Sequence, residues 1–195
     1  MAEANVIKKQ DLIESAKRCI VENGMNKVTL KAVAEGVGVT QGTVYYHFKT
    51  KDQLLLEVVK DMCRTSWERL EDMEKSTSDH AKEWIQVGLQ SASKRNEEGA
   101  FYHSLFLSLL TASLHNYAIR DQISDLLRYE NEVLKSQIET AVGQEVDGIS
   151  SDVWSVLINA LIDGLAIQSK FNQDFDELKT YQALEWLLVK QLKET

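Results

Sequence analysis

Hydrophobic residues recur at helical spacing along almost the whole chain. Near the start, Ile13, Ala16, Cys19 and Ile20 fall on one stripe, because side chains three or four positions apart share a helix face. Gly24 follows this stripe and is a typical C-cap. No segment alternates convincingly like a strand, and residues 143–151 are the most loop-like stretch of the C-terminal half. We therefore predict an all-α fold of about nine helices, over residues 7–23, 30–35, 40–48, 51–76, 79–96, 100–116, 119–142, 152–170 and 176–193.

Composition supports long helices and limits the class of protein. The 195 residues include no proline, which would break helix interiors, and 44% are apolar, enough for a sizeable core. Two cysteines, Cys19 and Cys63, are too few for a disulfide framework or a zinc site, and Cys19 on the stripe is expected in the core. No run approaches about 18 apolar residues, and the beginning of the chain lacks an apolar signal core. We expect a cytoplasmic protein without membrane segments.

The segment from residue 29 to residue 51 has the pattern of two short helices joined by a tight turn. Thr29 and Thr40 each precede one of these helices and can cap it, as Ser151 can cap the helix over 152–170. Gly38 suits the turn, and small or β-branched residues at positions 32, 33, 37, 39 and 44 allow close packing. This is a helix-turn-helix arrangement, whose second helix enters the major groove of DNA.

The second short helix carries side chains suited to DNA. Hydrogen-bonding groups that can read base edges lie near its beginning, namely Thr40, Gln41, Thr43 and Tyr45. Groups suited to phosphates lie at its end, namely Tyr46, His47 and Lys51. Other interpretations stay open: Gln41 and Thr43 can be exposed without touching bases, His47 can be a local cap, and Lys51 can simply be solvated. Phe48 is expected in the core.

The distribution of charge matters more than its total. The net charge of −8 argues against nucleic acid, because phosphate contacts need cations. However, residues 1–60 hold 9 basic and 7 acidic residues, a balance of +2, whereas residues 61–195 hold 13 and 23, a balance of −10. Residues 27–51 hold four lysines and one acid, a balance of +3. The candidate DNA face is therefore the basic part of an acidic molecule.

The same segment closely resembles the TetR family of bacterial one-component transcriptional regulators. The resemblance includes Gly24, Thr29, residues 34–38, the string Gly42-Thr-Val-Tyr-Tyr-His-Phe-Lys-Thr-Lys51 and the leucines at 54 and 55. It covers about residues 7–60, and in the C-terminal half only Asp163-Gly164-Leu165 with Gln168 is similar to the family. The resemblance implies a helix-turn-helix DNA-binding domain over residues 1–51 and an effector-binding and dimerisation domain over residues 52–195.

The resemblance also implies roles for single residues. Thr29 and Lys31 would approach the DNA backbone from the first short helix. Gln41, Gly42, Thr43 and Tyr45 would face base edges, with Gly42 at the point of closest approach. The phosphate-binding set would be the one named above, Tyr46, His47 and Lys51.

A single recognition helix reads few base pairs, so a two-fold dimer is expected. The last two predicted helices have apolar stripes that could form a four-helix bundle between two subunits. The expected interface residues are Val153, Val156, Leu157, Ala160, Leu161, Gly164, Leu165, Tyr181, Leu184 and Leu188. The alternative is that these stripes are only intramolecular core.

The middle helices supply apolar and aromatic side chains typical of a small-molecule pocket. The candidates are Met62, Trp67, Trp84, Tyr102, Phe106 and Tyr129, and we expect one or two of Trp67, Trp84 and Trp154 to line a cavity. The absence of basic residues over 101–114 favours a neutral or cationic hydrophobic effector.

The leading hypothesis is a homodimeric repressor of a palindromic DNA operator, released by a small hydrophobic effector. An alternative is a helical scaffold that uses the helix-turn-helix for protein contacts. The chain has no identifiable nucleophile–base pair, metal set or phosphate loop, so we predict no enzyme activity, no cofactor and no metal.

Overall fold

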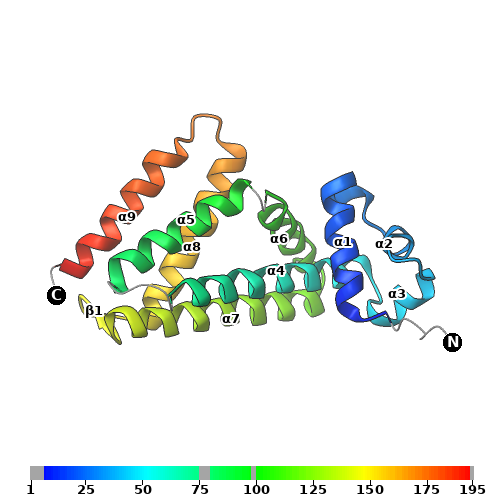
Figure 1. The fold of residues 1–195 in the computed structure, drawn as a ribbon, viewed down its shortest axis with the longest axis horizontal. Helices are drawn as coiled ribbons and strands as arrows, with labels where there is room; N and C mark the ends of the chain where they lie inside the picture. The colour runs from blue at the N-terminus through cyan, green and yellow to red at the C-terminus, as the bar shows by residue number, and fades with distance from the viewer. Residues whose placement is uncertain (1–6, 75–79, 98–99, 194–195) are drawn as a thin grey trace. The chain divides into compact units, whose positions relative to one another are not determined.

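The computed structural model describes residues 7–74, 80–97 and 100–193. In this part of the chain it contains nine α-helices, one short 3-10 helix and one two-stranded hairpin (Figure 1). The elements are α1 Lys9–Asn23, the 3-10 helix Met25–Lys27, α2 Leu30–Gly36, α3 Gln41–His47, α4 Lys51–Glu74, α5 His80–Glu97, α6 Ala100–Ser113, α7 Tyr117–Val142, β1 Glu145–Val146, β2 Ile149–Ser150, α8 Ser151–Phe171 and α9 Glu177–Lys193. The all-α prediction is confirmed, and the predicted helix ends at residues 76 and 79 lie outside the described residues.

The chain divides into two compact units. The first unit combines Met1–Met62 with Ser104–Ile123, and the second combines Cys63–His103 with Ser124–Thr195. Helices α4, α6 and α7 each pass from one unit into the other along the chain. The expected functional division at residues 51 and 52 stays a prediction. None of the described helices is long and apolar enough to cross a membrane.

The first unit has a core built on the predicted stripe of α1. Ile13, Ala16, Cys19 and Ile20 are all buried, which confirms the face that the sequence pattern predicts. Gly24 ends the helix at a φ of 81°, in the left-handed region that glycine tolerates, and its amide donates to the Ile20 carbonyl at 2.9 Å.

The second unit has a core between α5 and α9. Ile85, Leu89 and Ala92 of α5 are buried together with Tyr181 and Leu184 of α9. The spacing of these residues explains the contact, because each set lies on one face of its helix.

The segment predicted to be a loop contains a small hairpin instead. Glu145 pairs with Ser150, and Val146 pairs with Ile149. Asp147 and Gly148 form the connection with φ values of 52° and 73°, and Asp-Gly is a common sequence for a turn with two such residues.

The start of α8 also differs from the prediction. Ser150 is the N-cap residue, without a side-chain hydrogen bond, and Ser151 is the first residue of the helix. The Ser151 hydroxyl donates instead to Glu139 of α7 at 2.8 Å. A tertiary contact therefore replaces the expected local cap.

Candidate nucleic-acid interface and apolar pocket

Helices α2 and α3 each have a threonine as their N-cap residue. The Ala32 amide donates to the Thr29 hydroxyl at 3.0 Å, and the Thr43 amide donates to the Thr40 hydroxyl at 3.3 Å. Both caps confirm the sequence prediction. Each hydroxyl accepts from an amide in the first turn of a very short helix, where the amides have no acceptor one turn earlier in the helix.

The turn between the two helices holds them at close range. The Val39 amide donates to the Ala34 carbonyl at 3.0 Å across Gly38, whose φ is 70°. Val33 and Val44, one from each helix, are fully buried. Local turn geometry and two valines thus fix α3 on α2.

Gly36 brings α2 against α1. A Cβ at this position would overlap the hydroxyl oxygen of Ser15, which is buried and donates to the Val33 carbonyl at 2.9 Å. A side chain could enter only if the Ser15 hydroxyl rotated away and gave up its bond to Val33, or if α1 or α2 moved. The position of the helix-turn-helix on α1 therefore depends on this glycine.

The recognition helix α3 presents a largely exposed polar face. Gln41, Gly42, Tyr45 and Tyr46 are exposed, and the two tyrosines keep 53% and 75% of their surface accessible. In contrast, Phe48 is 2% exposed and lies in the core, as predicted. The adjacent aromatic residues therefore divide between the surface and the core, and the exposed ones are available for DNA.

The remaining predicted DNA contacts differ in their accessibility. Thr29, Lys31 and Thr40 are exposed, whereas Thr43 and His47 are half-buried. The hydroxyls of Thr40 and Thr43 lie 3.2 Å apart and form a hydrogen bond. The contacts of all these residues with DNA stay predictions.

Lys51 has an intramolecular role that the sequence pattern does not reveal. Its ammonium donates to the Met25 carbonyl at 3.2 Å, and the side chain is half-buried. This bond joins the start of α4 to the 3-10 helix. A lysine ammonium has three donors, so the bond leaves capacity for a phosphate.

Lys49 is a basic residue that the sequence analysis did not assign. Its ammonium lies 5.0 Å from the ring centre of Tyr45 and 5.6 Å from that of Tyr46, and it donates to the Tyr46 carbonyl at 3.2 Å. These contacts place a cation beside the exposed tyrosines of α3. The signal in the sequence was its position three residues after Tyr46.

The second unit contains an apolar pocket. The empty space inside it is about 390 Å³, a volume that includes open solvent. Its lining is almost entirely hydrocarbon. The Trp154 indole donates to the Val146 carbonyl at 3.2 Å, which ties β1 to α8 and gives the N–H of this indole a partner. The lining residues are Trp84, Ile85, Ile138, Val142, Val146, Trp154, Ile158 and Leu188.

Comparison with known proteins identifies the family. Residues 12–58 match the profile of bacterial regulatory proteins of the tetR family. The chain belongs to the TetR family. It is therefore a transcriptional regulator with a DNA-binding helix-turn-helix, as the residues of α2 and α3 indicate.

Individual relatives agree with this assignment. A fatty acid metabolism regulator protein of Bacillus subtilis is 29% identical over 152 residues, which cover 74% of this chain and 69% of that protein. The repressor AcnR of Corynebacterium diphtheriae is 31% identical over 55 residues, 28% of this chain and 29% of that protein. The structure of the regulator FadR from Bacillus subtilis in complex with stearoyl-CoA has a TM-score of 0.69 at 22% identity, and the match covers 94% of this chain and 99% of that one.

The predicted pocket residues of this TetR-family chain are divided between the two units, and one of them lines the described pocket of the second unit. Trp84 lines the apolar pocket, and so does Trp154, which confirms the expectation that one or two of the three tryptophans line a cavity. Met62 and Phe106 belong to the first unit, whereas Trp67, Tyr102 and Tyr129 belong to the second. Tyr102 donates to Glu130 at 3.1 Å, and the Cys63 thiol donates to the same oxygen at 3.2 Å. The binding roles of the predicted set stay predictions.

The predicted dimer residues separate into two groups. Those of α8 leave a continuous apolar stripe exposed, with Val153, Val156, Leu157 and Leu161 each 44–51% accessible and Ala160 and Gly164 also exposed, beside a half-buried Leu165. The stripe extends to Ile167 and Phe171, which the sequence analysis omitted.

The predicted interface residues of α9 do not form an exposed stripe. Tyr181 and Leu184 are each only 7% exposed and pack on α5, and Leu188 lines the pocket. The intramolecular alternative therefore describes these three residues in this structure. The apolar residues that α9 does expose are Leu178, Trp186 and Leu187.

Proposed function

We propose that this TetR-family regulator represses transcription as a homodimer on a palindromic operator and is released by a small hydrophobic effector. The observation that carries the proposal is the exposed polar face of α3, where Gln41 and two tyrosines are exposed and the cation of Lys49 lies beside the tyrosines. Amide and hydroxyl groups suit base edges, and lysine suits phosphates. A repressor among the relatives supports the direction of regulation.

The homodimer is supported by the stripe on α8. A contiguous apolar face along a helix is typical of a protein interface, since monomeric proteins rarely expose one. A second copy of the same stripe would cover it in a two-fold bundle. The two-fold symmetry of such a dimer predicts a palindromic operator, whose half-sites are expected about 34–36 Å apart, one turn of DNA, or a multiple of that distance.

The hydrophobic effector is supported by the pocket of the second unit. Its hydrocarbon lining favours an apolar group, and its tryptophans offer flat surfaces for an aliphatic or aromatic ligand. The stearoyl-CoA bound to FadR and the fatty acid metabolism regulator among the relatives are consistent with an acyl chain as one such group. An effector that binds the DNA-incompetent state more tightly would release the operator.

The DNA-binding part of this proposal can be tested with the protein alone. Selection from a pool of random duplexes should enrich a palindrome, and Gln41→Ala should relax discrimination at one position of each half-site by about 1–3 kcal/mol. Unchanged discrimination would remove the base-reading role of Gln41. If the wild-type protein enriched no duplex, the scaffold hypothesis would replace the repressor.

The effector part needs a ligand screen. Thermal shift measurements with acyl-CoAs, free fatty acids and neutral or cationic hydrophobic compounds should find ligands that raise the melting temperature, because binding stabilises the folded state by about 2.7 kcal/mol at a hundred times Kd. A hit must also weaken the complex with the selected duplex. If only polar anions without a hydrocarbon group bound, the hydrophobic effector would be excluded.

A further inference from the structure

The lining of the apolar pocket limits which part of a ligand can enter it. All eight lining side chains are hydrocarbon apart from two indole N–H groups, and that of Trp154 already donates to the Val146 carbonyl. A charged or strongly polar group would therefore lose its hydration inside the pocket and would meet no carboxylate, amide or ammonium there. We expect only the apolar part of a ligand to enter.

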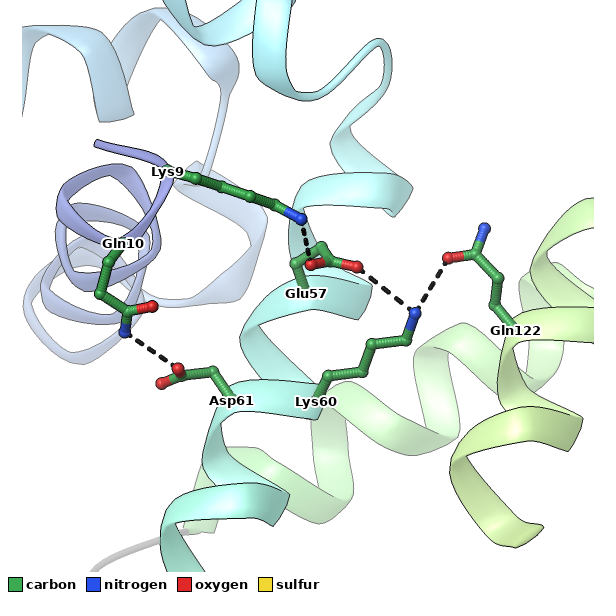
Figure 2. Close-up of polar contacts among 6 residues, drawn as sticks. All are labelled: Lys9, Gln10, Glu57, Lys60, Asp61 and Gln122. Atoms are coloured by element: carbon green, nitrogen blue, oxygen red, sulfur yellow. Dashed lines mark hydrogen bonds and ion pairs between the residues drawn. The ribbon is translucent and has the colours of Figure 1, made fainter. Parts of the chain in front are cut away.

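The first unit contains the kind of polar cluster that the pocket lining lacks. Lys60 donates to Glu57 at 3.3 Å and to Gln122 at 3.2 Å, and Asp61, only 9% exposed, accepts from Gln10 at 2.9 Å (Figure 2). The seven connected residues are Lys9, Gln10 and Lys17 of α1, Glu57, Lys60 and Asp61 of α4, and Gln122 of α7. These groups bond each other, and all of them belong to the first unit. The polar part of a pocket ligand must therefore be recognised from around the pocket of the second unit.

The size of the pocket limits the apolar part. Its empty space is about 390 Å³, and this volume includes open solvent. In another protein a dry cavity of about 150 Å³ binds benzene, which corresponds to about 25 Å³ for each carbon atom. At this density the whole space would hold about 15 carbon atoms, and the part inside the mouth would hold fewer. A complete stearoyl chain is thus too large for the pocket.

The charges around the pocket are mainly negative. Within three positions of the lining residues, the sequence has six acidic and three basic residues, a balance of −3. The acidic residues are Glu83, Glu139, Glu145, Asp147, Asp152 and Glu185, and the basic residues are Lys82, Lys135 and Lys190.

The segment that supplies most of the lining has only negative charges. Five of the eight lining residues fall within residues 138–158, which contain four acidic residues and no basic one. Of these acidic residues, Glu145, Asp147 and Asp152 are exposed. The pKa of Asp152 lies below its ordinary 3.8, mainly because the Ser150 side chain forms a hydrogen bond with its carboxylate, so this charge persists at neutral pH.

One basic residue offsets part of this negative charge. Lys135 lies three positions before the lining residue Ile138, and its ammonium is 3.9 Å from the Glu139 carboxylate. The remaining carboxylates attract a cation and repel an anion over about 10 Å, the Debye length at 0.1 M salt. A polyanion such as coenzyme A is therefore the least suitable head group, and a single cation is the most suitable one.

We propose that the ligand of the apolar pocket is a cationic amphiphile, with one ammonium-type cation on a hydrocarbon part smaller than a stearoyl chain. The hydrocarbon part fills the pocket, and the cation stays in solvent among the carboxylates around it. The proposal rests on the hydrophobic effector of the proposed function and narrows its chemical class. Such a ligand differs in charge and in length from the stearoyl-CoA in the structure of FadR.

The head group can be tested with three probes that share one decyl chain. The probes are decyltrimethylammonium, decanol and decanoate, each titrated below its micelle concentration. Tryptophan fluorescence reports binding, because Trp84 and Trp154 line the pocket. At about 50 mM salt the cation should bind at least about fivefold more tightly than the anion, and this ratio should approach one at about 1 M salt, where the Debye length is about 3 Å.

A charge variant shows whether the carboxylates near the pocket cause this preference. The triple variant Glu145→Gln, Asp147→Asn and Asp152→Asn removes the three exposed charges of residues 138–158. Asparagine tolerates the φ of 52° at position 147, so the hairpin turn should be kept. We expect the ratio between cation and anion at low salt to fall by at least half, with the decanol Kd changed by less than about twofold.

A matched control changes the net charge of the protein by the same amount. Glu22→Gln, Glu35→Gln and Asp121→Asn together remove three exposed acidic residues of the first unit. This variant should keep the wild-type ratio between cation and anion. Circular dichroism melts should show that both triple variants are folded.

The size limit can be tested with alkyltrimethylammonium ions from octyl to octadecyl. Affinity should rise by about fourfold for each added methylene while the chain still enters the pocket, and it should stop rising before octadecyl. Val142→Phe adds bulk at a half-buried lining position and should move this plateau to shorter chains. The control is the same substitution at Val21, which is 71% exposed on α1, and it should leave the plateau unchanged.

Each result decides the proposal. If decanoate or decanoyl-CoA bound as tightly as the cation at low salt, or if the charge variant kept the preference, the cationic head group would be wrong, although a hydrophobic effector would still be supported. Affinity that kept rising to octadecyl, or a plateau that Val142→Phe did not move, would overturn the size limit. If none of the three decyl probes bound, the hydrophobic effector itself would be overturned. A preference for the cation that is lost in the charge variant and kept in its control, together with the shifted plateau, establishes the proposal.

Discussion

Helices α3 and α8 each expose a surface to a proposed partner, but the two surfaces have opposite chemistry. On α3 the exposed side chains are polar or amphipathic, and the caps that start the helix are formed by its own neighbours in the sequence. On α8 the exposed side chains include a stripe of apolar residues, and the helix has contacts with α7 and β1. The beginning of α3 is thus fixed by bonds between neighbours in the sequence, whereas the beginning of α8 is fixed by contacts with distant segments.

The largest effect is expected on the α8 side of this comparison. Leu157→Glu places a charge in the middle of the exposed stripe, and burying it in a dimer would be costly. We expect monomers in sedimentation experiments and operator affinity reduced by at least about 100-fold, since each monomer then reads one half-site.

The control for this change is Val21→Glu. Val21 is 71% exposed on α1 and lies outside the stripe, so the substitution should leave the oligomeric state unchanged. A dimer that survives Leu157→Glu would show that the α8 stripe is not the interface.

The next effect concerns the packing of α2 on α1. Gly36→Ala would force its new Cβ into Ser15 and should lower the free energy of unfolding by about 1–3 kcal/mol. Urea unfolding measures this loss. Gly42→Ala, whose Cβ would have its nearest neighbour at 3.5 Å, should not destabilise the fold.

A double variant sharpens the explanation for Gly36. Adding Ser15→Ala to Gly36→Ala removes the overlapping hydroxyl, so it should recover part of the lost stability despite the loss of one hydrogen bond. Simple addition of the two single losses would contradict the steric explanation.

A smaller effect distinguishes two lysines at the end of α3. Lys51→Ala should lower the slope of the salt dependence of DNA binding by about one unit, because it removes a phosphate contact. It should also lower the free energy of unfolding, because it removes the bond to Met25. Lys49→Ala should lower the slope by about one unit with little change in stability, because this residue is exposed. Affinity titrations at several salt concentrations and urea melts separate the two roles. An unchanged slope would rule out a phosphate contact for the variant concerned.

The smallest effect is a pH dependence in the first unit. Because the folded pKa of Glu57 lies below its ordinary 4.5, the group stabilises the fold above that pH and loses its contribution as the pH falls through the folded pKa. The stability difference between wild type and Glu57→Gln should therefore be full near neutral pH and should shrink in acid. A difference that stays constant down to the lowest accessible pH would mean that the Glu57 charge does not contribute.

Most of the local structure could be predicted from the sequence, because its causes are local. The threonine caps of α2 and α3, the glycine that ends α1 and the buried stripe of α1 each depend on residues within a few positions. The hairpin was missed although Asp147-Gly148 is a turn signal, because its two-residue strands are too short to show an alternating pattern.

The two apolar stripes near the C-terminus show where sequence reasoning reaches its limit. Both have helical spacing and similar composition, yet α8 exposes most of its stripe while Tyr181 and Leu184 of α9 pack on α5. Periodicity says that a face is apolar, but not what covers it. The apolar pocket could not be predicted from the sequence either, because its lining combines residues from four helices and a strand.

The sequence alone thus determined the helices, their caps and the helix-turn-helix, with enough of its motif to indicate the family. Only the tertiary structure decided that Lys51 bonds Met25, that α9 packs inside the protomer and that seven polar residues of α1, α4 and α7 meet. The physical reason is the range of the interactions. Caps and periodic faces arise within one or two turns of chain, whereas packing and ion pairs depend on segments that are distant in sequence and that only the fold brings together.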